Sequence, residues 1–400
     1  MDIRWRPTEL PAVDSPEIAE LIFEPNWTSA YRKVIALEDQ YSKDLANMLQ
    51  DQHTNKDRTI LEAHLMYLRV VGWLYVFEGG TCRLQLSQWI LSCEDDETII
   101  DLGRFLCEHY IRAFRKSKGR MPFDSSDPSR NYFDCQRENL DQRLVTPLDD
   151  HATAQSKAHA RDNHQCAFIK WFSFSAPISQ RDLPSSTKRA ILRSAPALPN
   201  ISRREDVQDN PDAVRVPFCA LRCAHILSEP TNQDIHRSPD KRVWAASVSS
   251  IFERFGHVDI CDELKGPLVH RLENIISVSH DIHDDFDNLN IWLEHVGEPD
   301  GHRYRVCGPN AIFFAATIYS DDGIIEFTTP DDNTYPLPSR KYIKLHAAAC
   351  NVAHMSGAAD HFDNIDRVLE EDRVLAEDGH QVFVLEHRLQ QAMNTACGRP

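Results

Sequence analysis

The sequence predicts an α+β fold, in which a helical N-terminal region precedes a metal-binding ββα module with added strands and C-terminal helices. Three observations predict it. Residues 27–118 carry apolar side chains at helical spacing. Short alternating segments bounded by turn residues follow, as at 303–307. Between these regions, His225, Asn274 and His283 stand in the order of a metal-binding hairpin-helix unit.

The N-terminal part, residues 1–150, is expected to be a helical region followed by a linker. Over 99–114 apolar residues recur at helical spacing, with acidic residues before them and basic residues after them, as the helix dipole favours. Residues 65–77 are apolar nearly all round, which predicts a buried helix that ends at Gly79-Gly80. A further short helix is expected over 82–93, and the aromatic residues of this region are expected to lie mostly in a core.

The central part, residues 151–330, is expected to contain the metal-binding module. A linker with three prolines over 119–156 leads into it, and the module begins near Lys157. A basic, Pro- and Ser-rich insertion occupies about 178–214 and is too long for an ordinary connection. A helix is expected over 240–256.

Strands and helices complete the chain. Strands are expected at 303–307, 312–318 and 323–328, with turns between them. The last part, residues 331–400, is expected to consist of C-terminal helices over 341–359 and 364–394.

The charge of the chain bears on its partners. Its formal net charge is −17, whereas a protein that covers DNA phosphates usually presents a basic face. A local basic patch does exist between His151 and Arg204, with nine lysines and arginines against two aspartates. Because this stretch is also rich in Pro and Ser, a solvated insertion is the favoured interpretation.

Cysteine usage and the N-terminal sequence predict a cytoplasmic protein without a membrane anchor. The eleven cysteines include no CxxC pair, which indicates reduced thiols rather than a disulfide framework. Cys219 and Cys223 have no matching second pair, so zinc is disfavoured. The N-terminus has no apolar signal core, and the apolar run 65–77 contains Arg69 and is too short to span a bilayer.

Several motifs between 157 and 370 together resemble a large fungal group of HNH-nuclease-domain proteins. They are Ala160-Arg-Asp-Asn-His-Gln-Cys166, Cys223-Ala-His-Ile226, Glu253-Arg-Phe-Gly256, His270-Arg-Leu-Glu-Asn-Ile275, His283-x-x-Phe-Asp287, Thr328-Thr-Pro-Asp331, Pro336-Leu-Pro-Ser339 and His346 through Ala358. The resemblance implies an HNH-like ββα-metal module, with the first motif as its opening strand. A shared fold does not by itself establish activity.

In such a nuclease, the resemblance implies that His225 is the general base, Asn274 orients it, and His283 holds a divalent metal on the scissile phosphate. Two departures stand out. Ile169-Lys170 occupies the place of a Thr-Gly pair, so a tight turn has been lost or rebuilt. Ala224 precedes His225 where many such enzymes carry a ligand, so a second ligand is expected elsewhere, with Asp284 and Asp287 as candidates.

A third departure concerns Lys265, in Leu264-Lys-Gly266, where the group usually has asparagine. Here the chain resembles the non-canonical humulene synthases, which are fungal sesquiterpene cyclases of tropolone sesquiterpenoid biosynthesis. That resemblance implies farnesyl diphosphate as the substrate, Mg²⁺ as the cofactor (Mn²⁺ may substitute), Lys265 as a catalytic and diphosphate-binding residue, and Cys261 as a pocket residue. Near a turn, the plainer interpretation of Lys265 is a surface substitution.

The chemistry of a cyclase suits several residues of this region. The departing diphosphate requires divalent cations and a cationic side chain, and oxygen ligands suit Mg²⁺. Asn274, His283, Asp284 and Asp287 are the candidate metal ligands. The run Asp284-Asp-Phe-Asp-Asn288 is close to a DDxxD box, although acidic runs usually just face solvent. The cation then needs aromatic walls, to which Trp292 is a candidate contributor as a substrate-binding residue.

Three functions therefore remain open. The favoured one is a Mg²⁺-dependent sesquiterpene cyclase that ionises farnesyl diphosphate and forms a humulene-type hydrocarbon in fungal secondary metabolism. The alternative is a metal-dependent HNH DNA endonuclease, and nucleic acid is a partner only in that case. The third is a degenerate module that binds without catalysis.

Overall fold

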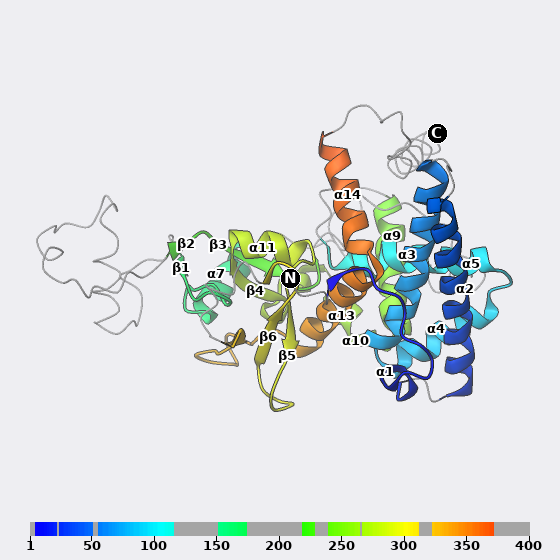
Figure 1. Ribbon diagram of the computed structural model, residues 1–400. Helices are drawn as coiled ribbons and strands as arrows, with labels where there is room; N and C mark the ends of the chain where they lie inside the picture. The colour runs from blue at the N-terminus through cyan, green and yellow to red at the C-terminus, as the bar shows by residue number, and fades with distance from the viewer. Residues whose placement is uncertain are drawn as a thin grey trace, which may run out of the picture.

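The computed structural model describes residues 5–21, 24–50, 55–115, 151–173, 218–228, 239–264, 266–311 and 322–371. A helical body lies on one side and a strand-containing part on the other (Figure 1). The helical body contains α1 (Pro16–Ala19), α2 (Pro25–Gln50), α3 (Asn55–Phe77), α4 (Gly80–Ser92), α5 (Asp96–His109) and the short 3₁₀ helix η2 (Ile111–Ala113). The α+β class is thereby confirmed.

Helix α3 is the centre of the helical body, because α2, α5 and the later helix α13 (Arg340–Ser356) all pack against it. Its segment Asp57–Phe77 is long and apolar enough to cross a membrane by length and composition, and 61% of its apolar window is buried inside the fold, as in a core helix. The helix begins at Asn55, before the apolar run 65–77 from which it was predicted. The predicted stop at Gly79-Gly80 is confirmed, because α4 begins there.

Helix α5 begins as its sequence predicts. The side chain of Asp95 accepts a hydrogen bond from the backbone N–H of Thr98 at 2.8 Å, which caps the first turn, and acidic residues follow in that turn. Tyr110 and Phe114, which follow α5 in the chain, pack against Phe252 of α9 (Pro239–Arg254). The helical body is thereby joined to the helices that follow the module's first strands.

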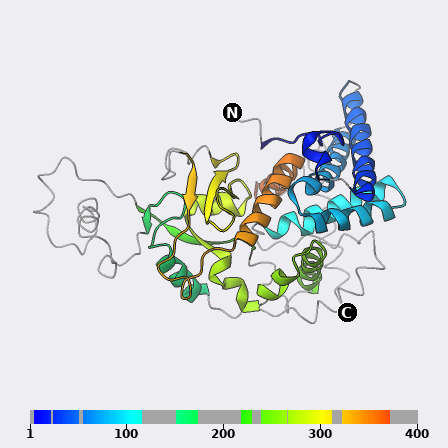
Figure 2. The same cartoon turned by 90° about the horizontal axis from the view of Figure 1, so that it is seen from below.

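The remaining helices follow the helical body along the chain. They are α7 (His151–Arg161), α9 (Pro239–Arg254), α10 (Val258–Glu263), the 3₁₀ helices η5 (Gly266–His270) and η6 (Leu272–Asn274), α11 (His280–Asp287), α13 (Arg340–Ser356) and α14 (Ala358–Glu371). Helix α13 lies between the helical body and the strands (Figure 2). It is buried on nearly all sides, and it ends at Gly357, whose φ of +93° suits a residue without a Cβ.

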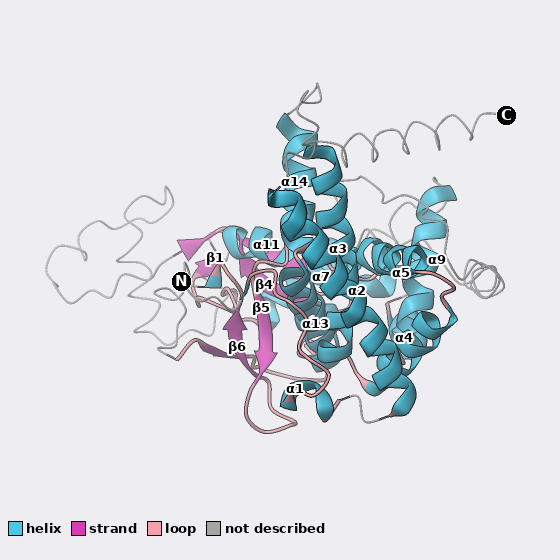
Figure 3. Cartoon of the chain, turned by 45° about the vertical axis from the view of Figure 1, so that its right-hand side comes forward, coloured by secondary structure: helices cyan, strands magenta, loops and turns pink. Residues whose placement is uncertain are grey.

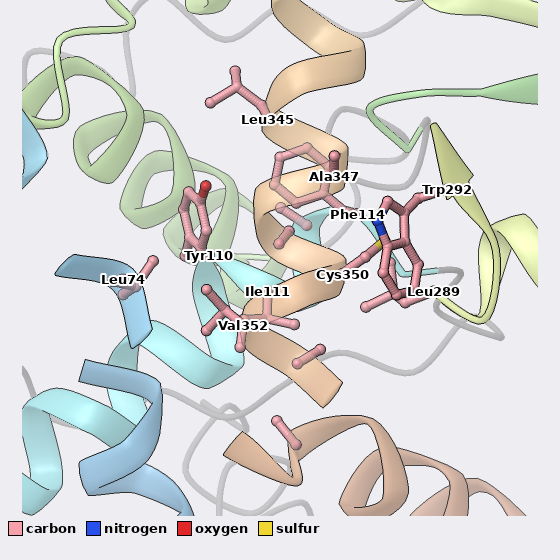
Figure 4. Close-up of a cluster of buried hydrophobic side chains, with 14 of the residues drawn as sticks. Leu74, Tyr110, Ile111, Phe114, Leu289, Trp292, Leu345, Ala347, Cys350 and Val352 are labelled. Atoms are coloured by element: carbon pink, nitrogen blue, oxygen red, sulfur yellow. The ribbon is translucent and has the colours of Figure 1, made fainter. Parts of the chain in front are cut away.

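The core is continuous across both parts of the fold. Figure 4 shows Ala347, Cys350 and Val352 of α13 beside Phe114, which follows η2, and Trp292, the first residue of β5 (Trp292–His295). The packing of α13 against both parts therefore fixes the strand-containing part relative to the helical body.

Within the described residues the strands form three small sheets, which lie on one side of the helical body (Figure 3). Strands β1 (Phe172–Ser173) and β2 (Phe218–Cys219) pair in parallel. Strands β3 (Leu221–His225) and β4 (Ile275–Ser279) form an antiparallel pair. Strands β5 (Trp292–His295), β6 (Arg303–Cys307) and β7 (Ile324–Glu326) form an antiparallel sheet in that order.

Most predicted elements that fall on described residues are confirmed. The helix over 82–93, the helix over 240–256 and the strands at 303–307 and 323–328 are α4, α9, β6 and β7. The predicted strand at 312–318 and the insertion at 178–214 lie outside the described residues, as does the C-terminal helix beyond Glu371.

Two predictions around residue 160 are wrong. Residues 151–156, expected in the linker, belong to α7. The motif Ala160–Cys166 is not an opening strand, because its first two residues end α7 and the next three form a turn. The physical reason is Arg161, whose fully buried side chain fixes the end of the helix against the module.

His346 on α13 should make the stability of the fold depend on pH. Its ring stacks on Phe286 of α11 with centroids 4.0 Å apart, and burial lowers its pKa from 6.5 to about 3. The folded state keeps the ring neutral while the unfolded chain takes up a proton below its ordinary pKa, so the free energy of unfolding should fall as the pH drops from 6.5 towards 3.

We expect His346→Phe, which keeps a stacked ring but cannot titrate, to reduce this slope. The measurement is urea unfolding at pH 7 and pH 5, with His280→Gln at an exposed histidine as the control. An unchanged slope in His346→Phe would contradict the assignment.

Candidate functional site

The candidate site is built on a hairpin-helix unit. Strand β3 pairs antiparallel with β4, and His225 at the end of β3 lies opposite Ile275 at the start of β4. Every residue of β4 is buried, including the polar residues Ser277 and Ser279. Helix α11 follows β4 without a loop and packs on both strands. The order β3, β4, α11 is thus a ββα arrangement.

The side chain of Asn274 connects two chain segments, one containing His225 and the other containing His270. Its Oδ1 accepts a hydrogen bond from the backbone N–H of Leu227 at 2.9 Å. Its Nδ2 donates to the carbonyl oxygens of Leu227 at 3.1 Å and Val269 at 2.9 Å. Leu227 follows His225 by two residues and Val269 precedes His270, so a single buried amide fixes both segments.

Two roles were predicted for Asn274, as a metal ligand and as the residue that orients His225. The geometry of its side chain does not suit the first. Its side chain is fully buried, and both its oxygen and its nitrogen are engaged with the backbone. We therefore do not place Asn274 among the metal ligands. An indirect orienting role for His225 stays a prediction to which these backbone contacts are suited.

His225 lies beside His270, for which no role was predicted. Nε2 of His225 and Nδ1 of His270 are 3.1 Å apart, and the rings meet edge to face with centroids 5.2 Å apart. His270 is buried, whereas His225 is half-buried. The signal for His270 was its place four residues before Asn274, but only the 3₁₀ turns of η5 and η6 bring it to His225.

His283 stands on α11 with acceptors beside both ring nitrogens. Its Nε2 is 3.2 Å from the carbonyl oxygen of Cys223 on β3. Its Nδ1 is 3.3 Å from Oδ2 of Asp287, one helical turn later, and 3.8 Å from Oδ1 of Asp284. The structure thus brings together three of the predicted ligands, with Asp287 partly buried and Asp284 half-exposed.

The other carboxylates of α11 point in different directions. Asp281 is exposed, whereas Asp285 accepts a hydrogen bond from Asn310 at 2.7 Å and has a raised pKa because it is half-buried. The acidic run therefore does not act as one box. Within the described residues, no group of three or more His, Cys, Asp or Glu side chains has the arrangement of a complete metal centre.

Of the three predicted substrate residues, only the side chain of Trp292 falls within what the structure describes. Lys265 lies outside the described residues, and Cys261 belongs to α10 with its side chain outside them. Trp292 is fully buried in the core, where its ring meets Trp5 edge to face and stacks on His354. Its Nε1 donates to Glu294 at 3.1 Å. Trp292 is thus a packing residue, and we do not place it in a substrate pocket.

The aromatic residues of the helical body are core residues as expected. Trp73, Tyr75, Trp89 and Trp244 are all buried. Tyr75 shares a hydrogen bond with Ser87 at 2.9 Å, and Trp244 donates to the carbonyl of Glu108 at 3.0 Å. Their polar atoms have partners inside the protein, which is how such side chains are accommodated in a core.

The chain makes a tight turn near residue 170 without a glycine. Lys170 adopts a φ of +54°, in the left-handed region, and its N–H donates to the carbonyl of Cys166 at 2.9 Å. Such a backbone costs a residue with a Cβ on the order of 1 kcal/mol, and glycine would avoid that cost. Burial also lowers the pKa of the Lys170 amine.

The two cysteines considered as zinc ligands are buried in β2 and β3. Burial raises the pKa of both Cys219 and Cys223 to about 12.

Comparison of the chain with family models, with curated proteins and with solved structures finds no match.

Proposed function

We propose that the ββα unit is the centre of a metal-dependent phosphodiesterase that cleaves nucleic acid, of the kind the HNH resemblance implies. The observation that carries this proposal is the placement of His225 and His283 on one hairpin-helix unit, with Asn274 fastening the loop beside His225. A base and a metal ligand on adjoining elements are the parts that phosphodiester hydrolysis requires.

The surroundings of His283 suit a divalent cation. A neutral imidazole carries one N–H, yet both ring nitrogens of His283 face oxygen atoms. If Nδ1 donates to Asp287, Nε2 presents a lone pair towards the carbonyl oxygen of Cys223. A separation of 3.2 Å is close to the ~3.0 Å between neighbouring ligands of an octahedral cation with bonds of about 2.1 Å. A carboxylate on the second ring nitrogen is also usual for a metal-bound histidine.

The residues then have distinct roles. His283 and the carbonyl of Cys223 would hold Mg²⁺ or Mn²⁺, with Asp284 at the rim and Asp287 orienting the imidazole. When bound, the cation supplies charge stabilisation at the phosphate. His225 takes the proton of the attacking water, and the buried amide of Asn274 keeps its segment in place.

The second candidate function is Mg²⁺-dependent ionisation of farnesyl diphosphate, as the humulene-synthase resemblance implies. The observation that favours it is electrostatic: α11 presents Asp281 and Asp284 to solvent on a chain of net charge −17. Such a surface repels a long polyanion and is compatible with a small diphosphate bound through Mg²⁺. Its catalytic lysine would be Lys265, with Cys261 shaping the pocket.

We expect the activity to require Mg²⁺ or Mn²⁺ rather than Zn²⁺, because the proposed donors are oxygens and a single imidazole. The measurement is plasmid nicking, and hydrocarbon release from farnesyl diphosphate, in each cation after dialysis against EDTA. Activity should vanish with EDTA and return with Mg²⁺ or Mn²⁺. Full turnover in excess EDTA would contradict this for both reactions.

A further inference from the structure

The histidine pair at the end of β3 suggests a function for a residue that has none so far. His270 is buried, and its Nδ1 faces Nε2 of His225 at 3.1 Å. At this separation one nitrogen must carry the hydrogen and the other must offer a lone pair. The pair thus couples the tautomers of the two rings, which decides which nitrogen of His225 can accept a proton.

We propose that His270 is a positioning residue that accepts a hydrogen bond from Nε2–H of His225 and so assigns the proton-accepting role to Nδ1 of His225. This inference rests on the proposed hydrolysis. In that step Nδ1 of His225 takes a proton from water while the water oxygen bonds to phosphorus. The P–O ester bond breaks, and its electron pair leaves with the ester oxygen, which takes a proton from solvent. The positive charge on His225 is then stabilised through Nε2–H and the lone pair of His270.

The segment that carries His270 is held firmly enough for this role. Nδ2 of Asn274 donates to the carbonyl of Val269, directly before His270. Directly after it, Arg271 donates to Glu273 at 2.6 Å. The backbone N–H of Ser339 donates to the carbonyl of Glu273 at 2.7 Å, which ties the segment to the start of α13. His270 therefore presents a fixed lone pair rather than a mobile side chain.

Two substitutions separate a positioning role from a packing role. In His270→Asn the amide oxygen takes nearly the place of Nδ1, so the acceptor is kept although volume is lost. In His270→Phe the ring volume is kept although the acceptor is lost. A packing residue should tolerate Phe better than Asn, whereas a positioning residue should tolerate Asn better than Phe.

We expect His270→Asn to retain plasmid nicking within about tenfold and His270→Phe to lose on the order of 10²-fold, as loss of an oriented general base implies. The second readout is the tautomer of His225, from nitrogen-15 NMR of histidine-labelled protein at a pH where the ring is neutral, with His225→Ala used to assign the signal. The wild type and His270→Asn should show Nε2–H, and His270→Phe should show a mixture.

Nicking by His270→Phe at the wild-type rate, or an Nδ1–H tautomer of His225 in the wild type, would overturn the proposal. If the wild type cleaves no DNA with any cation, the hydrolytic function fails separately. The tautomer of His225 in the wild type and in His270→Phe then decides alone whether His270 sets it.

Discussion

Replacing Arg161 with alanine should lower the free energy of unfolding by about 3–5 kcal/mol, the usual cost of removing one member of a buried ion pair. The guanidinium is fully buried and forms two hydrogen bonds to Asp162, at 2.8 and 2.9 Å. It also donates to the carbonyl oxygens of Leu272 and Ile275, both at 2.8 Å. Without it, the buried carboxylate of Asp162 loses its ion-pair partner, and the carbonyls of Leu272 and Ile275 each lose a hydrogen bond.

Urea unfolding monitored by fluorescence and by circular dichroism measures this change. The matched control is Arg222→Ala, at an exposed arginine on β3, which should change the free energy of unfolding by less than about 0.5 kcal/mol. A similar, small effect of both substitutions would show that the clamp of Arg161 does not stabilise the module.

Local sequence patterns predicted the helices and strands whose formation is decided by their own residues. The acidic start of α5 and the glycines before α4 mark those elements directly. The side chains of Arg303–Cys307 largely alternate between polar and apolar, as in a half-buried strand, and this segment forms β6. In each case the hydrogen-bonding or the exposure of a residue follows from neighbours within one or two turns.

Contacts between distant segments could not be predicted in the same way. The partner of His225 depends on two 3₁₀ turns near residue 270 and on a strand pairing that spans about fifty residues, for which no local pattern exists. Trp292 looks the same in a sequence whether it lines a pocket or a core, and Trp5 and His354 make it a core residue here. The strand at Ala160 was predicted only from the resemblance to the HNH group, and the buried contacts that Arg161 makes at the end of α7 have no signature in the sequence.

The two candidate reactions should separate most clearly in His225→Ala and Lys265→Ala, compared side by side. In the hydrolytic mechanism His225 is the general base, so its removal should lower plasmid nicking by about 10²–10⁴-fold. Lys265 would be one phosphate contact among several, and its loss should matter less as the salt concentration rises. A cyclase needs no activated water, so His225→Ala should then be tolerated, whereas Lys265→Ala should cost on the order of 10²-fold in hydrocarbon output.

The measurement is nicking of supercoiled plasmid and extraction of volatile products from farnesyl diphosphate and Mg²⁺, for the wild type and both variants. Lys341→Ala, at a partly exposed lysine 3.5 Å from Asp259, is a matched control for loss of positive charge. Sesquiterpene from the wild type but not from Lys265→Ala would replace the hydrolytic proposal by the cyclase. Nicking that depends on His225 while no hydrocarbon forms would exclude the cyclase, because the ββα unit would then be working through its base and not through the lysine.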